Sequence, residues 1–293
     1  MSRGKTAVLR PTAGRARVAF QGELGAYSQG AVYAFFGKVD VVPLPTLQRV
    51  FASLSEPPGG QVDFAVVPIE NSVAGSVGET FDLLFSSDVR IVGETSIPVR
   101  HCLMIHRDAG PEGITKVMSH PQGLAQCREY LDAHHRGWEQ VPAYDTAGSA
   151  KMIRDRAMKD TAAIASELAC EIYGMTLLAR GVEDDHSNAT RFVVIARADA
   201  PGETAPTGDD KTSVIFTTSH AAGSLVRALG CLSSRGISLA RVESRPIRGR
   251  SWEYSFYVDF YGHMKDKKCA EGLEELGRDT LQLKVLGSYP RAV

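Results

Sequence analysis

Residues 184–196, DDHSNATRFVVIA, place a polar cluster directly before an apolar run of the length of one strand. Such a run predicts a buried strand with the polar residues at its mouth. Thr190 then offers a hydroxyl proton, and Arg191 offers a fixed fork of donors suited to a carboxylate. The alternative is a turn before a core strand with Arg191 in a surface ion pair. A three-residue motif recurs by chance, so this stretch alone favours that alternative.

The length and composition indicate a globular protein of two or three domains. The chain has 293 residues, with 43% hydrophobic residues, 23% charged residues and a formal net charge of -1. This charge argues against nucleic acid or an anionic membrane as a partner. We expect residues 1–16 to be a basic lead-in rather than a secretory signal. The five cysteines are scattered and odd in number, which favours a reducing cytoplasm without disulfides or a zinc site.

Between residues 17 and 198, strand-like runs alternate with glycine-rich or polar loops and helix-like segments. One run ends in the glycine loop 22–28, and another ends in Glu70-Asn71-Ser72. This alternation predicts an α/β fold in which loops at strand ends carry a ligand. The chain is expected to cross into a second lobe near residues 91–98 and to return near 174–178. A cleft between the lobes would then hold a small molecule.

The remainder of the chain predicts a second, smaller α+β domain. Residues 199–210 are rich in proline, glycine and acids and are expected to form a linker. Residues 211–293 follow the order β-α-β-β-α-β, which is the ferredoxin-like arrangement.

Five motifs in order support a resemblance to a known family. They are GELGAYS at 22–28, PIENS at 68–72, SHPQ at 119–122, DTA at 145–147 and NATRF at 188–192. Together they resemble prephenate dehydratase, a family with a two-lobed, periplasmic-binding-protein-like catalytic domain. The resemblance covers nearly all of residues 17–198. Residues 211–293 resemble the ACT regulatory domain of the same enzymes, because residues 243–246 match its ESRP motif.

The resemblance implies a decarboxylating dehydration of prephenate to phenylpyruvate. Formation of the aromatic ring drives this reaction, so no cofactor or metal is expected. Thr190 would donate a proton to the leaving hydroxyl, and Arg191 would bind a carboxylate. The family motifs place further polar residues in the cleft, with Phe192 as its wall. The expected catalytic residues besides Thr190 are Asn71, Ser119 and Gln126, and the expected substrate contacts besides Arg191 are Tyr27, Ser28, Glu70, Ser72, Asp145 and Phe192.

For the C-terminal domain, the resemblance implies allosteric binding of L-phenylalanine between paired ACT domains. A homodimer or homotetramer is therefore expected. The motif residues expected to bind the effector are Gly223, Leu225, Val226, Glu243, Ser244, Arg245 and Pro246. Two alternatives stay open at this point. One is arogenate dehydratase, which acts on the amino analogue of prephenate, and the other is a non-catalytic amino-acid sensor.

Overall fold

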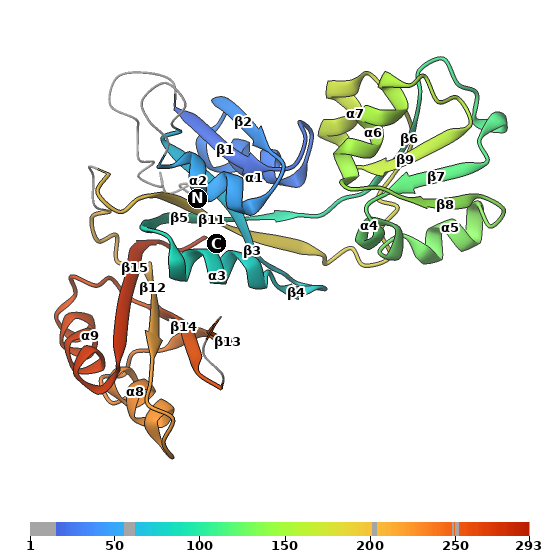
Figure 1. Cartoon of the computed structure of the whole chain (residues 1–293). Helices are drawn as coiled ribbons and strands as arrows, with labels where there is room; N and C mark the ends of the chain where they lie inside the picture. Colours follow the sequence, from blue (N-terminus) through green and yellow to red (C-terminus); the bar gives the residue numbers. More distant parts are fainter. Residues whose placement is uncertain (1–15, 56–61, 201–203, 248, 250–251, 293) are drawn as a thin grey trace.

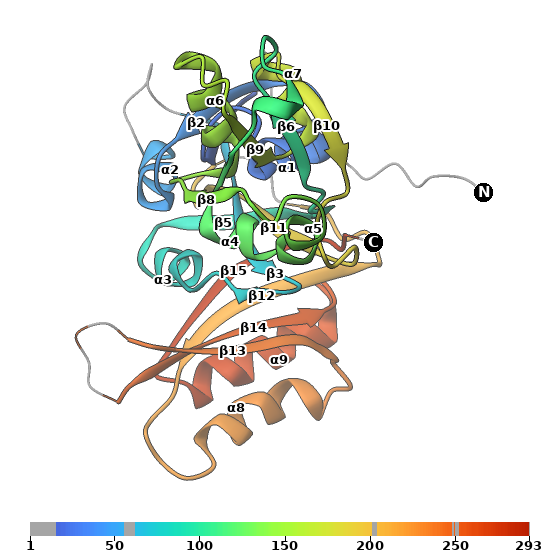
Figure 2. The same cartoon turned by 90° about the vertical axis from the view of Figure 1, so that its right-hand side faces the viewer.

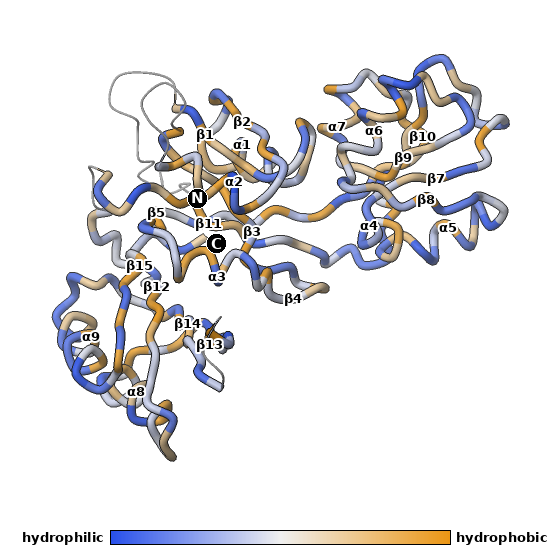
Figure 3. Tube along the Cα trace, in the orientation of Figure 1, coloured by the Kyte–Doolittle hydropathy of each residue, from blue (hydrophilic) through white to orange (hydrophobic). Residues whose placement is uncertain are grey.

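Three β-sheets, each with its own helices, organise the chain (Figure 1). The computed structural model describes residues 16–55, 62–200, 204–247, 249 and 252–292. The expected lead-in therefore lies outside the described residues, apart from Ala16. Figure 3 shows hydrophobic residues along the inner strands and hydrophilic residues along much of the outer helices α5 and α9.

The first sheet has the strand order β2-β1-β3-β11-β5, and the short strand β4 pairs with β3. β1 is parallel to β2 and β3, whereas β11 is antiparallel to β3 and β5. The strands are β1 (Arg17–Gln21), β2 (Asp40–Leu44), β3 (Phe64–Asn71), β4 (Gly75–Ser76), β5 (Val89–Pro98) and β11 (Ala189–Arg197). The helices are α1 (Tyr27–Phe36), α2 (Leu47–Ser53) and α3 (Gly78–Ser86).

Both faces of the first sheet are buried, which explains the continuous apolar runs of its strands. Phe192 and Val194 of β11 lie in the core that includes residues of α1. Val193 and Ile195 lie in the core on the opposite face, with residues of α2 and α3. Successive side chains of a strand point to opposite faces, so β11 presents its residues alternately to the two cores.

The second lobe is built on a sheet with the order β10-β6-β9-β7-β8. Its strands are β6 (Cys102–Ile105), β7 (Lys116–Ser119), β8 (Glu139–Pro142), β9 (Thr161–Ala165) and β10 (Thr176–Arg180). Its helices are α4 (Pro121–Ala125), α5 (Arg128–His134), α6 (Thr146–Asp155) and α7 (Glu167–Tyr173), with a 3-10 turn at Pro111–Gly113.

The chain passes between the lobes later than the sequence predicted. The crossings lie at residues 99–101 and 181–188, not at 91–98 and 174–178. β5 first completes its pairing with β11, and β10 first pairs with β6. An extended run alone does not show to which sheet a strand belongs, so the sequence placed both crossings too early.

The third sheet belongs to a β-α-β-β-α-β unit at residues 210–292, here called the C-terminal unit. Its strand order is β13-β14-β12-β15, and all neighbours are antiparallel. Its elements are β12 (Asp210–Thr217), α8 (Ser224–Ser233), β13 (Leu239–Pro246), β14 (Tyr254–Tyr261), α9 (Lys267–Asp279) and β15 (Gln282–Pro290). Helices α8 and α9 cover one face of this sheet (Figure 2).

The other face of the C-terminal sheet packs on the first lobe. Ile215, Tyr257, Leu286 and Tyr289 share one core with residues of α2, α3 and the first sheet. The Tyr257 hydroxyl donates to the carbonyl oxygen of Phe81 on α3 at 2.6 Å. The C-terminal unit is therefore joined to the first lobe by a continuous apolar core, not only by a linker.

Candidate active site

Thr190 lies directly opposite Asn71, where β11 enters the first sheet. Asn71 Nδ2 donates to Thr190 Oγ1 at 2.9 Å and to Asn188 Oδ1 at 2.8 Å. Asn71 Oδ1 accepts from the backbone N–H groups of Val73 at 3.0 Å and Ala74 at 2.8 Å. A backbone N–H can only donate, so these two bonds fix the orientation of the amide. Thr190 is then the acceptor, and its own hydroxyl proton stays available for another group.

A β-bulge in β3 creates this pairing. Phe192 pairs with Pro68 but Arg191 pairs with Glu70, so Ile69 is an extra residue in β3. Without it, Glu70 would face Thr190 and Asn71 would face Ala189. Proline cannot donate to the ladder and occurs inside sheets mainly at edges and bulges. Pro68 is therefore a sequence signal for the bulge.

A second polar network joins the two lobes beside the first crossing. The ring of His101 bonds through Nδ1 to the Tyr27 hydroxyl at 2.8 Å and through Nε2 to Gln126 Oε1 at 2.9 Å. Tyr27 begins α1 of the first lobe, whereas Gln126 follows α4 of the second lobe. Burial lowers the pKa of His101, so the neutral ring donates through one nitrogen and accepts through the other. The sequence predicted Tyr27 and Gln126 but not His101, which no motif marks.

A cavity of about 380 Å³ lies between the lobes and brings three of the predicted substrate contacts together. Tyr27 and Ser28 line it from the first lobe, and His120, Tyr144 and Asp145 line it from the second. The Asp145 carboxylate caps α6 by accepting from the Gly148 N–H at 2.7 Å. Burial raises the pKa of Asp145 above its ordinary value.

The remaining polar residues lie outside the lining of this cavity. Ser119 is fully buried, and its hydroxyl donates to the carbonyl oxygen of Ile164 at 2.7 Å. Ser72 is exposed, and its hydroxyl accepts from the Ala189 N–H at 3.0 Å, next to Thr190. The structure therefore groups Ser72 with the Thr190–Asn71 pair and leaves Ser119 in the interior of the second lobe.

The structure corrects the expected role of Arg191, and with it that of Glu70. The Arg191 guanidinium lies 3.1 Å from Glu70, 3.4 Å from Glu94 and 3.3 Å from Asp259 of the C-terminal unit. Thr190 and Arg191 are consecutive in a strand and therefore point to opposite faces. A guanidinium held by three carboxylates on the far face does not bind a substrate beside Thr190. Only 19% of the Arg191 side chain is exposed, so the surface ion pair is also wrong.

Phe192 also differs from the expectation. It is 2% exposed and belongs to the core that includes residues of α1, so it lies in the interior and not on the wall of the cleft.

The residues expected to bind an effector lie on α8 and its N-terminal cap and on β13 of the C-terminal unit. Glu243 accepts from the Ser76 hydroxyl at 2.8 Å, and Arg245 lies 3.3 Å from Asp82 on α3. These two side chains therefore contact the first lobe within one chain. Gly223 has a φ of 81° at the start of α8, and Val226 is 74% exposed on the same helix, while Leu225 packs on the helix core.

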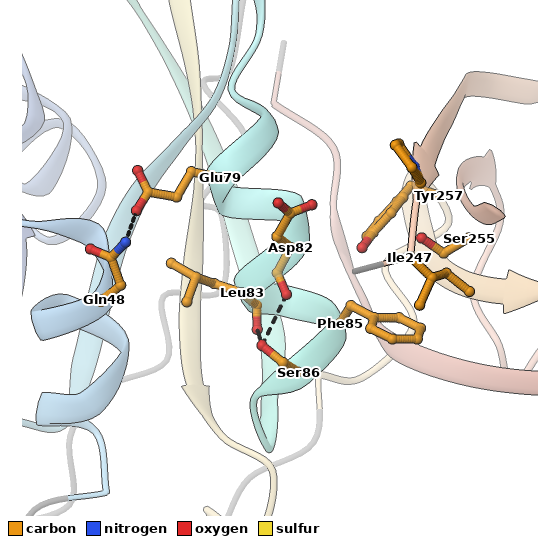
Figure 4. Close-up of a pocket in the computed structure, with 10 residues that line it drawn as sticks. Gln48, Glu79, Asp82, Leu83, Phe85, Ser86, Ile247, Ser255 and Tyr257 are labelled. Carbon is orange, nitrogen blue, oxygen red and sulfur yellow. Dashed lines mark hydrogen bonds between the residues drawn. The ribbon is translucent and has the colours of Figure 1, made fainter. Parts of the chain in front are cut away.

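A crevice of about 290 Å³ separates α3 from the end of β13. Figure 4 shows Asp82 and Phe85 on α3 facing Ile247 and Tyr257 of the C-terminal unit. Pro246, the last residue of the expected ESRP motif, also lines this crevice.

One cluster of three possible metal ligands occurs among the described residues, and it lies far along the chain from Thr190. It consists of Cys231, Glu275 and Asp279 on α8 and α9. Glu275 is paired with Arg235, so this cluster carries no argument for a metal. Within the described part of the chain, no helix combines the length and the apolar character needed to cross a membrane.

The fold defines a two-lobed α/β protein joined to a β-α-β-β-α-β unit. Its candidate site has the Thr190 hydroxyl, held by the Asn71 amide, at the start of β11. Comparison with known proteins gives the family. The family model for prephenate dehydratase matches residues 18–200, which is more than half of the chain, so the chain belongs to the prephenate dehydratase family. This confirms the resemblance drawn from the five motifs.

Relatives of known name agree with this assignment. The chain is 40% identical over 278 residues to a bifunctional chorismate mutase/prephenate dehydratase of Stutzerimonas stutzeri, covering 94% of this chain and 74% of the relative. It is 38% identical over 286 residues to arogenate dehydratase/prephenate dehydratase 2, chloroplastic, of Arabidopsis thaliana, covering 94% and 73%.

Two solved structures resemble the whole chain. A prephenate dehydratase from Arthrobacter aurescens in complex with L-Phe has a TM-score of 0.84 at 31% identity, covering 94% of this chain and 90% of that one. GqqA, described as a quorum-quenching acylase, has a TM-score of 0.85 at 32% identity, covering 94% and 97%. Both alignments extend through the C-terminal unit, so the complete arrangement occurs in known proteins.

Proposed function

We propose that this chain is a prephenate dehydratase, which removes water and carbon dioxide from prephenate to give phenylpyruvate. The observation that carries this proposal is the hydrogen bond from Asn71 Nδ2 to Thr190 Oγ1 in a chain of this family. The bond leaves Thr190 with a proton to donate. A non-catalytic sensor has no need for such a donor, so the enzyme is the better supported of the two alternatives.

The chemistry follows from that one donor. As the bond between the ring and its hydroxyl breaks, Thr190 gives a proton to the departing oxygen, which leaves as water. The bond to the ring carboxylate breaks at the same time, and its electron pair completes the aromatic ring while carbon dioxide leaves. The Thr190 oxygen then recovers a proton from solvent. A threonine hydroxyl is a weak acid in water, so it must act as an oriented donor in a site that excludes water.

The other polar residues are proposed to bind or orient the substrate. Tyr27, Ser28 and Asp145 line the cavity between the lobes, and Ser72 lies beside Thr190. Gln126 is proposed to act by fixing His101 at the crossing, and Ser119 is proposed to act through its hydrogen bond to the carbonyl oxygen of Ile164.

Arogenate dehydratase is a second candidate because one relative at 38% identity is named for both activities. Arogenate carries an ammonium group where prephenate carries a keto group. The Asp145 carboxylate in the cavity between the lobes is a group that could accept this ammonium. Steady-state assays with each substrate, on wild type and Asp145→Asn, decide between them. Arogenate as the main substrate predicts that the variant loses arogenate turnover selectively.

The C-terminal unit is proposed to be an ACT regulatory domain that binds L-phenylalanine. A structural neighbour of the whole chain is described in complex with L-Phe. The proposed effector site of this chain lies between paired C-terminal units of a homodimer or homotetramer. The residues proposed to form it are Gly223, Leu225, Val226, Glu243, Ser244, Arg245 and Pro246.

All five cysteines are free and buried, which supports the expected cytoplasmic location.

The direct test of the function is Thr190→Ala, with Thr190→Ser as the matched variant. Alanine removes the donor, so kcat for prephenate should fall by about two to four orders of magnitude while the melting temperature stays close to wild type. Serine keeps the hydroxyl and should retain a measurable part of kcat. Wild type that binds prephenate without turning it over would support the sensor instead, and an alanine variant with normal kcat would remove Thr190 from the mechanism.

A further inference from the structure

Arg191 connects the strand of the proposed proton donor to the C-terminal unit. It follows Thr190 directly on β11, and its Nη1 lies 3.3 Å from Asp259 Oδ2 on β14. The same nitrogen lies 3.4 Å from Glu94 Oε2 on β5. The Asp259 carboxylate is fixed in turn, because it accepts from the Ser213 hydroxyl at 2.5 Å. The Arg191 side chain is thus held by the fixed Asp259 carboxylate, which belongs to the sheet of the C-terminal unit.

Glu94 is also held from the C-terminal unit. Lys211 Nζ donates to its two oxygens at 2.7 and 2.8 Å, and the Ala292 N–H donates to it at 3.0 Å. The side chains of Glu94 and Lys211 are only 1% and 8% exposed. Two cations, Arg191 and Lys211, thus face two buried acids, Glu94 and Asp259, while the more exposed Glu70 also lies 3.1 Å from Arg191. Removing one member of such a set leaves a buried charge uncompensated, so the set resists rearrangement.

The partner of Thr190 is anchored by the same unit. Ser76 lies on β4, which pairs with Glu70 and Asn71 of β3. The Ser76 hydroxyl donates to Glu243 at 2.8 Å and accepts from Arg241 Nη2 at 2.7 Å. Both members of the Thr190–Asn71 pair therefore lie on strands that β13 and β14 hold from the far face of the sheet.

We propose that Arg191 is a positioning residue through which the C-terminal unit sets the Thr190 hydroxyl, and with it kcat. The inference rests on the proposed function, because it needs Thr190 to be the proton donor. A strand is stiff along its backbone, and Thr190 and Arg191 share one peptide bond. A shift of Arg191 toward or away from Asp259 therefore moves the Thr190 oxygen relative to Asn71 and the substrate. Because Arg191 does not contact the substrate, its substitution should change kcat and leave KM nearly unchanged.

The experiment uses the full chain and Asp259→Asn, a substitution of equal size that removes the charge and keeps an oxygen for Ser213. We expect kcat for prephenate to fall by about tenfold with KM changed by less than about twofold. Arg191→Met should lower kcat by at least as much. The double variant should be no slower than Arg191→Met alone, because both substitutions break the same contact.

The matched control is Lys284→Met. Lys284 also bridges the C-terminal unit and the first lobe, since its Nζ donates to the carbonyl oxygen of Leu84 at the end of α3 at 2.9 Å. This contact does not end on β11. Lys284→Met should therefore lower the melting temperature while kcat stays within about twofold of wild type.

Three results would overturn the inference in an active wild-type enzyme. They are an unchanged kcat in Asp259→Asn, losses that multiply in the double variant, and an equal loss of kcat in Lys284→Met. A rise in KM at constant kcat in Arg191→Lys would instead return Arg191 to substrate binding. An inactive wild type would refute the proposed function itself, and this result is distinct from the others.

Discussion

At the scale of single residues, the decisive feature is the direction of one hydrogen bond. Asn71 Nδ2 donates a hydrogen bond to Thr190 because the Asn71 side-chain oxygen already accepts from two backbone N–H groups. The amide therefore cannot rotate to become an acceptor without losing both of those bonds. The loop that follows β3 therefore fixes the Asn71 amide as a donor, which leaves the Thr190 hydroxyl proton available to the substrate.

Asn71→Asp tests this direction. The carboxylate keeps one oxygen for Val73 and Ala74, so the loop should stay folded. Its second oxygen faces Thr190 and accepts a hydrogen bond from the Thr190 hydroxyl, which withdraws that proton from the substrate, so kcat should fall by about a hundredfold or more. Thermal unfolding by circular dichroism controls for folding. An aspartate variant with nearly normal turnover would show that this amide does not orient the donor.

The sequence allowed Thr190 to be predicted at the start of a strand, but it did not show on which face of the sheet Arg191 lies. The NATRF motif and the apolar run after it identified the strand and its mouth. Whether Arg191 faces the cleft or the C-terminal unit depends on the pairing register. That register depends on a bulge at Ile69, for which Pro68 is the only local signal. The three acids around Arg191 come from β3, β5 and β14, and no sequence spacing connects them.

At the scale of elements, the two crossing segments and the bond network beside them determine how the lobes are joined. Tyr27, His101 and Gln126 link α1 to the end of α4 through a neutral imidazole. The strands and helices on either side could be predicted from apolar runs and caps. The crossings could not, because β5 and β10 are continuous extended runs that belong wholly to one sheet each.

This network predicts a pH dependence of stability. Burial holds the pKa of His101 below its ordinary value of 6.5, so the unfolded chain binds more protons between these two values. The free energy of unfolding should therefore fall as the pH drops below 6.5 toward the folded pKa. Thermal melts of wild type and His101→Gln between about pH 7.5 and about pH 5.5 measure this. Wild type should lose more melting temperature than the variant, whereas parallel curves would contradict the assignment.

At the scale of the whole molecule, the C-terminal unit presents its helices outward and its sheet inward. Val226 on α8 and Val242 on β13 are 74% and 46% exposed. The proposed pairing of C-terminal units would cover Val226 with a second copy of the chain. The order β-α-β-β-α-β could be predicted from the sequence, but the contacts of Glu243 with Ser76 on β4 and of Arg245 with Asp82 on α3 required the structure.

Light scattering should give a mass of at least twice the 31.6 kDa of one chain. Val226→Asp places a charge in the expected contact, so it should shift the protein toward monomers and raise the phenylalanine concentration for half-maximal inhibition by about tenfold or more. Ile172→Asp is the matched control, because Ile172 is also an exposed apolar residue on a helix, but in the second lobe. A monomeric wild type, or equal effects of both variants, would contradict the expected assembly.

The buried ion set between β11, β5 and the C-terminal unit has a consequence for how such chains diverge. Glu94 and Lys211 lie in different domains, yet each has its counter-charge in the other. A chimera that exchanged the C-terminal unit between relatives would need to carry both members of every such pair. Otherwise it would leave ions without partners in a dry interface. Electrostatics alone therefore favours joint inheritance of the first lobe and the C-terminal unit.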